Sequence, residues 1–542
     1  MSDEVAPSPK PSDSGSRMLR EGGKLSALTM VSRILGLVRE MTKAAFMGTG
    51  PLAEAFSVGF IIPNFLRRLF AEGSVTVAFI PTFTGILEDG DRDKTREFLS
   101  ATFTVLTFLV LSIVAFGIAA TPWIATLFGS ERGETIVLTR MMFPFLALVS
   151  VAALLQGILN SIGVFVPSGV GPILFNVCFI GVPYLIGGWT ANPARAMAVG
   201  VLAGGLAQAL CQLPAVLKAG YRFGFIGLGR ALRNPGMRRV LALIAPTILG
   251  MAAYQVNELV CTSLASQVQA AAAIGYSLRL MELVLGVFAV SAGTVLLPRL
   301  SRAAREADWA TYSGDLGRVM RSMILITLPV AAFSMIAGRE IVTLLFKARA
   351  FGEDSVALTT SIFLFHMTGL AFVALNRVVA PAFYARSDAK TPTWAGLVSF
   401  GINIALAFAL IGPLRGRGIA LALSVSSAVN TLILVGALWK RQVEGLRASL
   451  LGALRYFLRI LAFSAVAGAA LLTLRPWILA PFAASASRFV SAGLPLLIET
   501  LVFGLVGVGL LALSKDELAA GLSGRLGGRL AWKRRAREGK PS

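Results

Sequence analysis

The sequence predicts an all-α polytopic membrane protein with about fourteen transmembrane helices. Of its 542 residues, 56% are hydrophobic and only 14% are charged, and the mean hydropathy is +0.75. A soluble globular domain carries roughly 25% charged residues, so this chain could not cover a soluble surface with polar groups. The strands of a membrane β-barrel alternate apolar and polar residues, whereas long stretches here are apolar throughout, which excludes a barrel.

Apolar runs long enough to cross a bilayer recur along the chain. About 20 mostly apolar residues are needed for one transmembrane helix. We expect such helices at 25–47, 55–86, 98–122, 138–160, 168–188, 196–217, 238–266, 270–298, 317–338, 356–385, 392–411, 417–439, 452–474 and 489–513. An even number of spans places both termini on the same side of the membrane.

The basic residues indicate which side that is. Lys and Arg number 50 against 28 Asp and Glu, a net charge of +22. In a membrane protein such residues concentrate in cytoplasmic loops. With the N-terminus inside, the basic segments 92–96, 221–239, 298–306 and 532–540 are all cytoplasmic, and outer loops such as 128–135 are poor in basic residues. We therefore expect cytoplasmic termini, contacts with membrane lipids and no nucleic-acid partner.

The two ends of the chain are polar. Residues 1–24 are rich in Pro, Ser and Lys and lack the apolar core of a cleaved signal peptide. We expect a disordered cytoplasmic tail at 1–24 and a basic cytoplasmic tail at 515–542.

The cysteines and the only histidine do not predict a metal site. Cys178, Cys211 and Cys261 lie in apolar runs without metal-ligand spacing, and His366 stands alone in SIFLFHMTGL. Such residues usually pack as small hydrophobes or as a single buried imidazole.

Two similar segments indicate an internal repeat. The second expected span ends in VAFIPTFT (77–84) and the eighth ends in TVLLPRLS (294–301), each with a proline between apolar residues at the inner face. This offset predicts two six-helix lobes followed by a C-terminal helix pair. Transporters are often built from such repeats, with the substrate site between them.

The first expected span carries an unusual number of charges. Arg33, Arg39, Glu40 and Lys43 lie within it, although an ionisable group at the bilayer centre costs at least ~2.5 kcal/mol. Ser32, Arg39 and Lys43 follow the spacing i, i+7, i+11 and share one face of a helix. That face is expected to line a water-filled cavity.

The second span also contains charges after a helix-breaking proline. Pro63 is followed by Arg67 and Arg68, and Glu72 stands four residues after Arg68. The spacing favours a structural Arg68–Glu72 ion pair, which leaves Arg67 without a local acid.

The seventh and eighth spans add further polar groups. Asn257 and Glu258 lie in AAYQVNELVCTS, and Arg279 precedes Glu282 by one turn in YSLRLMELVLG. Snorkelling to an interface could explain any one of these arginines, but it explains the whole set poorly. Guanidinium groups suit bidentate phosphate contacts, so we expect a cationic cavity for a phosphate or pyrophosphate. The chain has no GxxxxGK[ST] loop, so it contains no ATPase of its own.

Five sequence blocks resemble the signatures of a known family. They are SRILGLVRE (32–40), AEAFSVGFIIPNFLRRLFAEGSVTVAFIPTF (53–83), YSLRLMELVLGV (276–287), GTVLLPRLS (293–301) and AFYARSDAKTP (382–392). They are similar to blocks of the MurJ/MviN family, the bacterial lipid II flippases of the multidrug/oligosaccharidyl-lipid/polysaccharide exporter superfamily. The resemblance extends from about residue 25 to about residue 515.

The resemblance implies an architecture and a transport function. It implies fourteen helices, with lobes at 25–218 and 237–440 around a central cationic cavity, and a helix pair at 450–514 that borders a groove for the lipid tail. The substrate would be lipid II, undecaprenyl-pyrophosphoryl disaccharide pentapeptide. It would be moved from the cytoplasmic to the outer leaflet of the bacterial inner membrane by alternating access, without enzymatic chemistry. Proteins of cell-wall synthesis or division are further candidate partners.

The resemblance and the intramembrane charges together assign candidate roles to individual residues. We expect substrate contacts from Ser32, Arg33, Arg39, Arg67 and Arg279. We expect structural or gating roles for Glu40, Glu54, Arg68, Glu72, Glu258 and Glu282.

The chain departs from the family pattern at some positions. Glu54 stands where the family usually has Asp, which keeps the charge, and Leu283 and Val284 replace a proline often seen in the eighth helix. Some members bind sodium through aspartates of the seventh, eleventh and twelfth helices. Here Asn403 and SVSSAVNT (424–431) offer oxygens, but Glu258 is the only carboxylate in those spans. We therefore assign no metal and no cofactor, and leave coupling to the membrane potential or to a monovalent cation open.

Other functions fit the residues less well. The nearest alternative is an exporter of another polyprenyl-pyrophosphate-linked oligosaccharide in the same superfamily. A cationic-drug exporter would need an acidic cavity, and a multi-span glycosyltransferase would need a carboxylate base, usually on a sizeable outer loop. A scaffold without transport would gain nothing from arginines inside the membrane.

Overall fold

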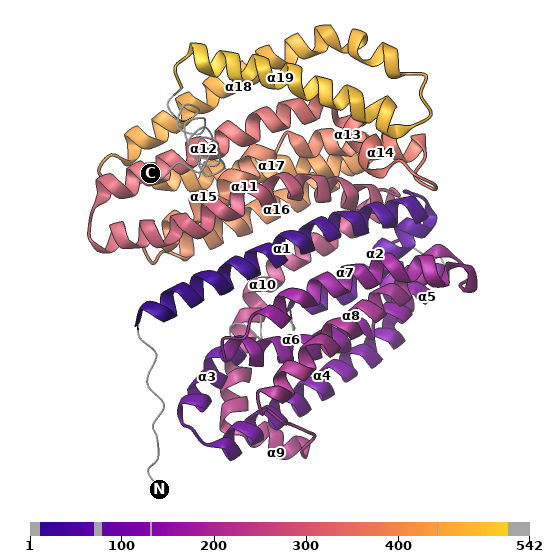
Figure 1. Cartoon of the computed structure of the whole chain (residues 1–542), viewed down its shortest axis with the longest axis vertical. Helices are drawn as coiled ribbons and strands as arrows, with labels where there is room; N and C mark the ends of the chain where they lie inside the picture. The colour runs from indigo at the N-terminus through magenta and orange to yellow at the C-terminus, as the bar shows by residue number, and fades with distance from the viewer. Residues whose placement is uncertain (1–10, 70–77, 130–132, 442, 517, 519–542) are drawn as a thin grey trace, which may run out of the picture. The chain divides into compact units, whose positions relative to one another are not determined.

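The computed structural model describes residues 11–69, 78–129, 133–441, 443–516 and 518. Every regular element in these ranges is a helix, as the composition predicts (Figure 1). The described part of the chain divides into two compact units. The first comprises the described residues up to Ala272 together with Ala348–Gly352, and the second comprises Ala273–Lys347 and the described residues from Glu353 onward.

The first half of the chain forms ten α-helices and one short 3₁₀ helix. They are α1 (Pro11–Met47), α2 (Pro51–Arg67), α3 (Ile80–Glu88), α4 (Arg92–Leu127), α5 (Gly133–Met142), α6 (Phe145–Ser161), α7 (Val166–Ile186), η3 (Gly187–Trp189), α8 (Pro193–Lys218), α9 (Leu228–Arg233) and α10 (Pro235–Gln267) in the described ranges. Helix α1 begins at Pro11, inside the segment 1–24 that we expected to be a disordered tail. Residues 1–10 lie outside the described ranges.

The second half continues with helices to Leu513. They are α11 (Ala271–Arg305), α12 (Trp309–Ile336), α13 (Gly338–Phe346), α14 (Glu353–Met367), α15 (Leu370–Tyr384), α16 (Lys390–Leu414), α17 (Gly416–Lys440), α18 (Leu446–Leu479), η4 (Ala480–Phe482), the π-helical turn η5 (Phe489–Gly493) and α19 (Leu494–Leu513). The expected basic tail at 515–542 lies almost entirely outside the described residues.

Membrane spans can be identified by length and hydropathy. In the described ranges, nine helical segments are long and apolar enough to cross a membrane, and α14 with α15, bent by 45°, would form a tenth. The remaining expected spans are 25–47, 55–86, 238–266 and 270–298. Helices α1, α10 and α11 have 37, 33 and 35 residues, more than the length of one span, and part of 55–86 lies outside the described residues. The total of fourteen stays a prediction.

Aromatic stacking holds part of the first unit together. The rings of Phe79, Phe83 and Phe98 stack with centroids 5.2 to 6.1 Å apart, and Met237 and Val240 of α10 belong to the same buried cluster. Offset aromatic pairs stabilise a core beyond their buried area. Because α10 packs on α2, α3, α4 and α9, it belongs to the first unit, although its sequence range falls in the second lobe that we expected.

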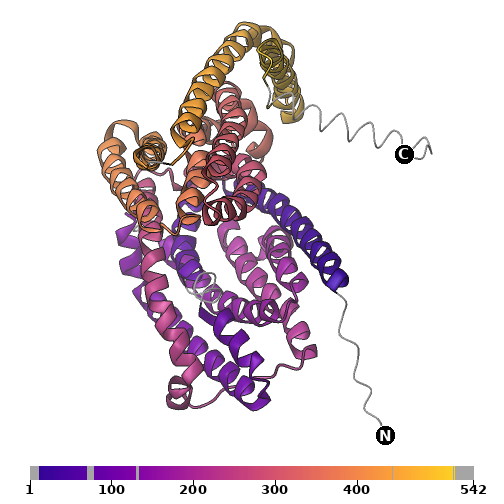
Figure 2. The same ribbon diagram turned by 90° about the vertical axis from the view of Figure 1, so that its left-hand side faces the viewer.

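The second unit is built around α12. Its buried face packs against α15 and α18, and the hydroxyl of Tyr312 donates a 2.6 Å hydrogen bond to the carbonyl of Ala382. Helices α18 and α19 run side by side (Figures 1 and 2). The outward face of α19 is apolar and exposed at Leu497, Leu501 and Leu505, as is typical of a helix that faces lipid.

Candidate functional site

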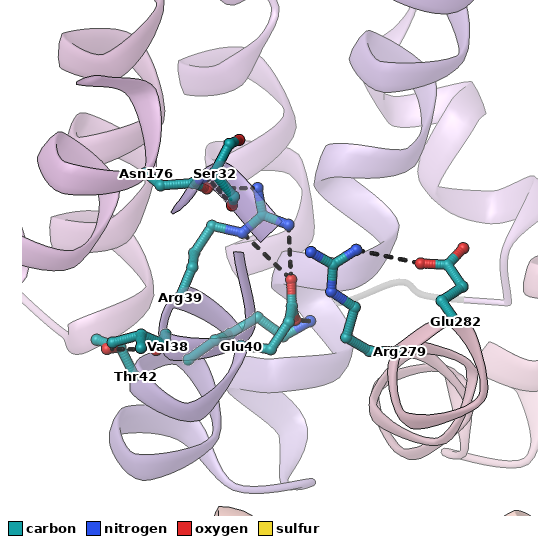
Figure 3. A network of polar contacts seen from close by, with 9 residues as sticks. Ser32, Val38, Arg39, Glu40, Thr42, Asn176, Arg279 and Glu282 are labelled. Atoms are coloured by element: carbon teal, nitrogen blue, oxygen red, sulfur yellow. Dashed lines mark hydrogen bonds and ion pairs between the residues drawn. The ribbon is translucent and has the colours of Figure 1, made fainter. Parts of the chain in front are cut away.

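Asn176 of α7 forms hydrogen bonds with two residues of α1. Its side-chain oxygen accepts a 3.2 Å hydrogen bond from Nη1 of Arg39, and its Nδ2 donates to the backbone carbonyl of Ser32, also at 3.2 Å (Figure 3). Asn176 is only 5% exposed, so both bonds are formed where water competes little. The structure therefore brings the backbone of Ser32 and the side chain of Arg39 to one neighbour.

Arg39 is held by a carboxylate and two rings as well. Its Nε and Nη2 donate to Oε1 of Glu40 at 3.3 and 2.9 Å, and Nζ of Lys43 lies 3.4 Å from the other oxygen of Glu40. The guanidinium also lies 5.9 Å from the ring centroid of Phe175 and 5.5 Å from that of Phe179. Two cations thus contact one carboxylate, and this arginine–lysine cluster (Arg39, Glu40, Lys43) has a formal charge of +1. Such a cluster attracts anions.

The two arginines of α2 have different neighbours. Nε of Arg67 donates to Oδ1 of Asn64 at 3.0 Å, whereas Arg68 forms an ion pair with Glu258 of α10. The expected partner of Arg68, Glu72, lies outside the described residues, so that pair stays a prediction. The sequence did not connect Arg68 with Glu258, because they lie 190 residues apart and share no helical period.

Glu54 serves as a cap for another helix. It is 6% exposed, and its two oxygens accept hydrogen bonds from the backbone amides of Ala271 and Ala272 at 3.1 and 2.9 Å. These are the first residues of α11, whose amides have no partner within the helix. A carboxylate at this position also interacts favourably with the helix dipole. The structural or gating role that we expected for Glu54 stays a prediction.

Arg279 of α11 has an acid nearby and an unsatisfied donor. Its Nη1 donates to Oε2 of Glu282 at 3.1 Å (Figure 3), and its Nε is buried with no hydrogen-bond partner among the described residues. A buried donor left unsatisfied costs about 1–3 kcal/mol. Because the Glu282 side chain is 56% exposed, its contact with Arg279 is easily exchanged with water or an anion.

The oxygens considered for sodium mostly join helices. Ser424 donates to the carbonyl of Phe365 at 2.8 Å, and Thr431 donates to Oδ1 of Asn376 at 2.9 Å. Asn403 is 2% exposed. In the described part of the chain, no three His, Cys, Asp or Glu side chains are grouped so that they could hold a metal ion.

The histidine and cysteines are packed inside the protein. His366 is 1% exposed, and its Nδ1 lies 2.6 Å from the hydroxyl of Ser277, so its predicted packing role is confirmed. Cys178, Cys211 and Cys261 are free thiols that are partly buried.

Sequence reasoning missed one buried ionic cluster. Arg475 of α18 contacts both Glu340 of α13 and Glu499 of α19. The signal was present, since LTLRPWIL and LPLLIETLVFG each place a charge in an apolar run.

Comparison with known proteins gives consistent matches. A model of the family described as lipid II flippase MurJ matches residues 43–487. A probable lipid II flippase MurJ of Treponema pallidum (strain Nichols) is 43% identical over 521 residues, covering 93% of this chain and 98% of the relative. The lipid II flippase MurJ of Burkholderia cenocepacia is 32% identical over 456 residues, covering 82% and 87%.

Solved structures share the fold. A structure described as lipid II flippase MurJ in an inward closed conformation matches with a TM-score of 0.74 at 20% identity, covering 91% of this chain and 99% of that one. An inward-facing multidrug resistance MATE family transporter matches with a TM-score of 0.61 at 15% identity, covering 80% and 98%.

Proposed function

The chain belongs to the MurJ family of lipid II flippases, and we propose that its arginines bind the pyrophosphate of lipid II while the lipid is moved from the cytoplasmic to the outer leaflet. Membership follows from the family match over residues 43–487 and from the 43% identity to a relative of nearly equal length. The protein is therefore a transporter and not an enzyme, and its place is the bacterial inner membrane.

The arginine–lysine cluster carries the proposal. Arg39 and Lys43 both contact the carboxylate of Glu40, and Asn176 fixes the orientation of the guanidinium. A guanidinium binds a pyrophosphate through two parallel hydrogen bonds. A bound pyrophosphate would offer its oxygens to the guanidinium of Arg39 and the ammonium of Lys43.

Glu40 and Glu282 would act as internal substitutes for the substrate. Each carboxylate now accepts hydrogen bonds from a guanidinium, Glu40 from Arg39 and Glu282 from Arg279. A pyrophosphate would replace these carboxylates and release them to water. In the empty site these carboxylates offset the desolvation cost of the arginines. They also prevent the empty site from holding other anions tightly.

The other charged residues complete a cationic cavity in this proposal. Ser32, Arg33 and Arg67 would contact the headgroup together with Arg39 and Arg279. Alternating access would expose the cavity to each side of the membrane in turn.

The remaining acids and Arg68 would hold helices in register during this movement. Glu258 pairs with Arg68 across two helices, and Glu54 holds the start of α11. We assign Glu72 to the same group on the sequence pattern alone. Lobes at 25–218 and 237–440 remain our expectation for the moving parts.

The lipid tail would remain in the membrane beside the last two helices. A small hollow lies among α12, α18 and α19 and is lined mostly by apolar side chains that include Phe463 and Phe503. An apolar groove of this kind suits a polyprenyl chain.

Orientation and energy source are further parts of the proposal. Both termini would be cytoplasmic, since the exposed arginines of α9 and its flanks then face the inner leaflet. The membrane potential would bias the charge-moving steps of the transport cycle by ~2.3 kcal/mol per charge per 100 mV. Alternatively, transport of a monovalent cation would drive the cycle.

Complementation of a flippase-depleted bacterium tests the proposal. Arg39→Ala should abolish growth while the protein is still inserted, and Arg39→Lys should support partial growth because the charge remains without the two-pronged geometry. Arg230→Ala is the matched control, because Arg230 lies in the short helix α9 and its side chain is 71% exposed. Normal growth of the Arg39→Ala strain would reject the proposed role.

A further inference from the structure

A buried cluster of three charged residues joins α13, α18 and α19. Nη2 of Arg475 donates to Oε1 of Glu340 at 2.7 Å, and Nε of Arg475 donates to Oε1 of Glu499 at 3.1 Å. The Glu499 side chain is fully buried, and that of Glu340 is 7% exposed. We call Glu340, Arg475 and Glu499 the hairpin cluster, because it attaches the α18–α19 hairpin to α13.

The charges of the hairpin cluster do not balance when both acids are ionised. One guanidinium would then face two carboxylates, leaving a net charge of −1 on two buried acids and an arginine whose side chain is 27% exposed. An uncompensated charge at such a place costs several kcal/mol. When two carboxylates share one site, one of them holds its proton strongly.

The unsatisfied oxygens of the two acids support the same conclusion. Oε2 of Glu340 and Oε2 of Glu499 are both buried, and neither has a hydrogen-bond partner in the part of the chain that the structure describes. A carboxylate oxygen can only accept, whereas a protonated carboxyl can also donate. A single proton would therefore remove the excess charge and supply a donor among acceptors.

Neighbouring groups in the described ranges do not offer another source of positive charge. Arg339 and Lys347, at the two ends of α13, both pair with Glu353, which lies outside the hairpin cluster. The half of α12 that follows Leu325 and the turn η5 contain no ionisable side chain, and Arg488, which directly precedes η5, donates to the backbone carbonyl of Lys347 at 2.9 Å. The charged groups that act on Glu499 from the described elements packed against it are thus Glu340 and Arg475.

We propose that Glu340 and Glu499 together bind one proton at neutral pH, so that the hairpin cluster is a neutral proton-binding site. Glu340 lies in the first turn of α13, where the helix dipole favours a negative charge. Glu499 lies inside α19, away from the start of the helix, so no helix dipole favours its ionisation. The proton therefore resides on Glu499. Loss of this proton would leave an uncompensated carboxylate between the α18–α19 hairpin and α13, and would weaken the attachment of the hairpin to α13.

Infrared spectroscopy of the full-length protein in lipid nanodiscs tests this proposal. At neutral pH the wild type should show the carbonyl stretch of a protonated carboxylic acid. Glu499→Gln should remove this band, and Glu340→Gln should remove it too, because Glu499 can then ionise against Arg475 one to one. Arg475→Gln should roughly double the band area, since both acids then lose their counter-ion.

Control measurements distinguish a shared proton from an exposed acid and from a bound cation. Glu353→Gln is the matched control, because that side chain is 56% exposed and paired with two cations, and its removal should leave the band unchanged. If a variant does not fold, a pH titration of the wild type decides, since the band should persist to a pH well above the range of exposed carboxyls. A wild-type spectrum without the band would overturn the proposal. A band that disappears in sodium buffer and returns when choline replaces sodium would also overturn the proposal, because the site would then hold a metal cation.

Discussion

The ion pair between Arg68 and Glu258 gives a quantitative prediction about stability. Their side chains are 31% and 37% exposed, so the pair lies between a surface pair, worth about 0–1 kcal/mol, and a buried pair, whose breakage costs about 3–5 kcal/mol. We expect Arg68→Ala to destabilise the protein by about 2 kcal/mol, mostly because Glu258 keeps a half-buried charge without its partner.

A double-mutant cycle measures this coupling. Thermal unfolding of the purified protein should show that Glu258→Gln recovers about 1 kcal/mol or more of the loss caused by Arg68→Ala, and growth should recover in parallel. Arg67→Ala should gain nothing from Glu258→Gln, because Glu258 forms its ion pair with Arg68. Strictly additive effects of Arg68→Ala and Glu258→Gln would refute this reasoning. Rescue of Arg68→Ala by Glu72→Gln alone would instead indicate the Arg68–Glu72 pair that the sequence spacing predicts.

Three further predictions test the cap, a charged loop and the orientation. Glu54→Ala should lower the unfolding temperature by a few degrees, since it removes the acceptor of two buried amides worth about 1–2 kcal/mol; Glu54→Gln should lose less, and equal losses would contradict the charge–dipole part of the account. Hydrogen bonds, chiefly from the backbone amide of Thr391, lower the pKa of Asp388. Its stabilising contribution is therefore complete above the unfolded-state pKa and is lost as the pH falls through the lower folded-state pKa. Asp388→Asn should accordingly flatten the acid side of the stability profile, and an unchanged profile would contradict this. A cysteine introduced at 298–306 should react with a membrane-impermeant reagent only from the cytoplasmic side and one near position 130 only from outside; the reverse pattern would overturn the orientation.

The sequence predicts much of the architecture because membrane helices have a strong local signal. The nine helical segments that satisfy length and hydropathy in the described ranges all coincide with expected spans. The expected second span is less regular, with α2 ending at Arg67. The fourth is broken between Met142 and Phe145, and the tenth is bent between Met367 and Leu370. Hydropathy alone does not show such breaks, because they change backbone direction and not composition.

The contacts of the candidate site are only partly contained in the sequence. The spacing of Ser32 and Arg39 predicts that their side chains share a face, which stays a prediction, because Asn176 contacts the side chain of Arg39 but the backbone of Ser32. Asn176 itself could not be predicted, because its role depends on which helix packs against α1. Glu54 was assigned through family resemblance alone, and its hydrogen bonds to the first amides of α11 could not be predicted from the sequence. Long-range pairs of this kind follow from packing, which has no period along the chain.

The hairpin cluster illustrates a different limit of sequence reasoning. A glutamate in an apolar run such as LPLLIETLVFG is itself a signal, because a buried acid requires a partner. The partner of Glu499 is Arg475, 24 residues away, on a neighbouring helix whose register the sequence does not fix.

The affinity of the purified protein for lipid II tests the central claim most directly. Each charge-assisted hydrogen bond contributes about 1.5–3 kcal/mol, so Arg39→Ala or Arg279→Ala should weaken binding by at least about tenfold. Arg39→Lys should fall between the wild type and Arg39→Ala. Correctly inserted alanine variants of Arg33, Arg39 and Arg279 that bind lipid II with wild-type affinity would contradict the account.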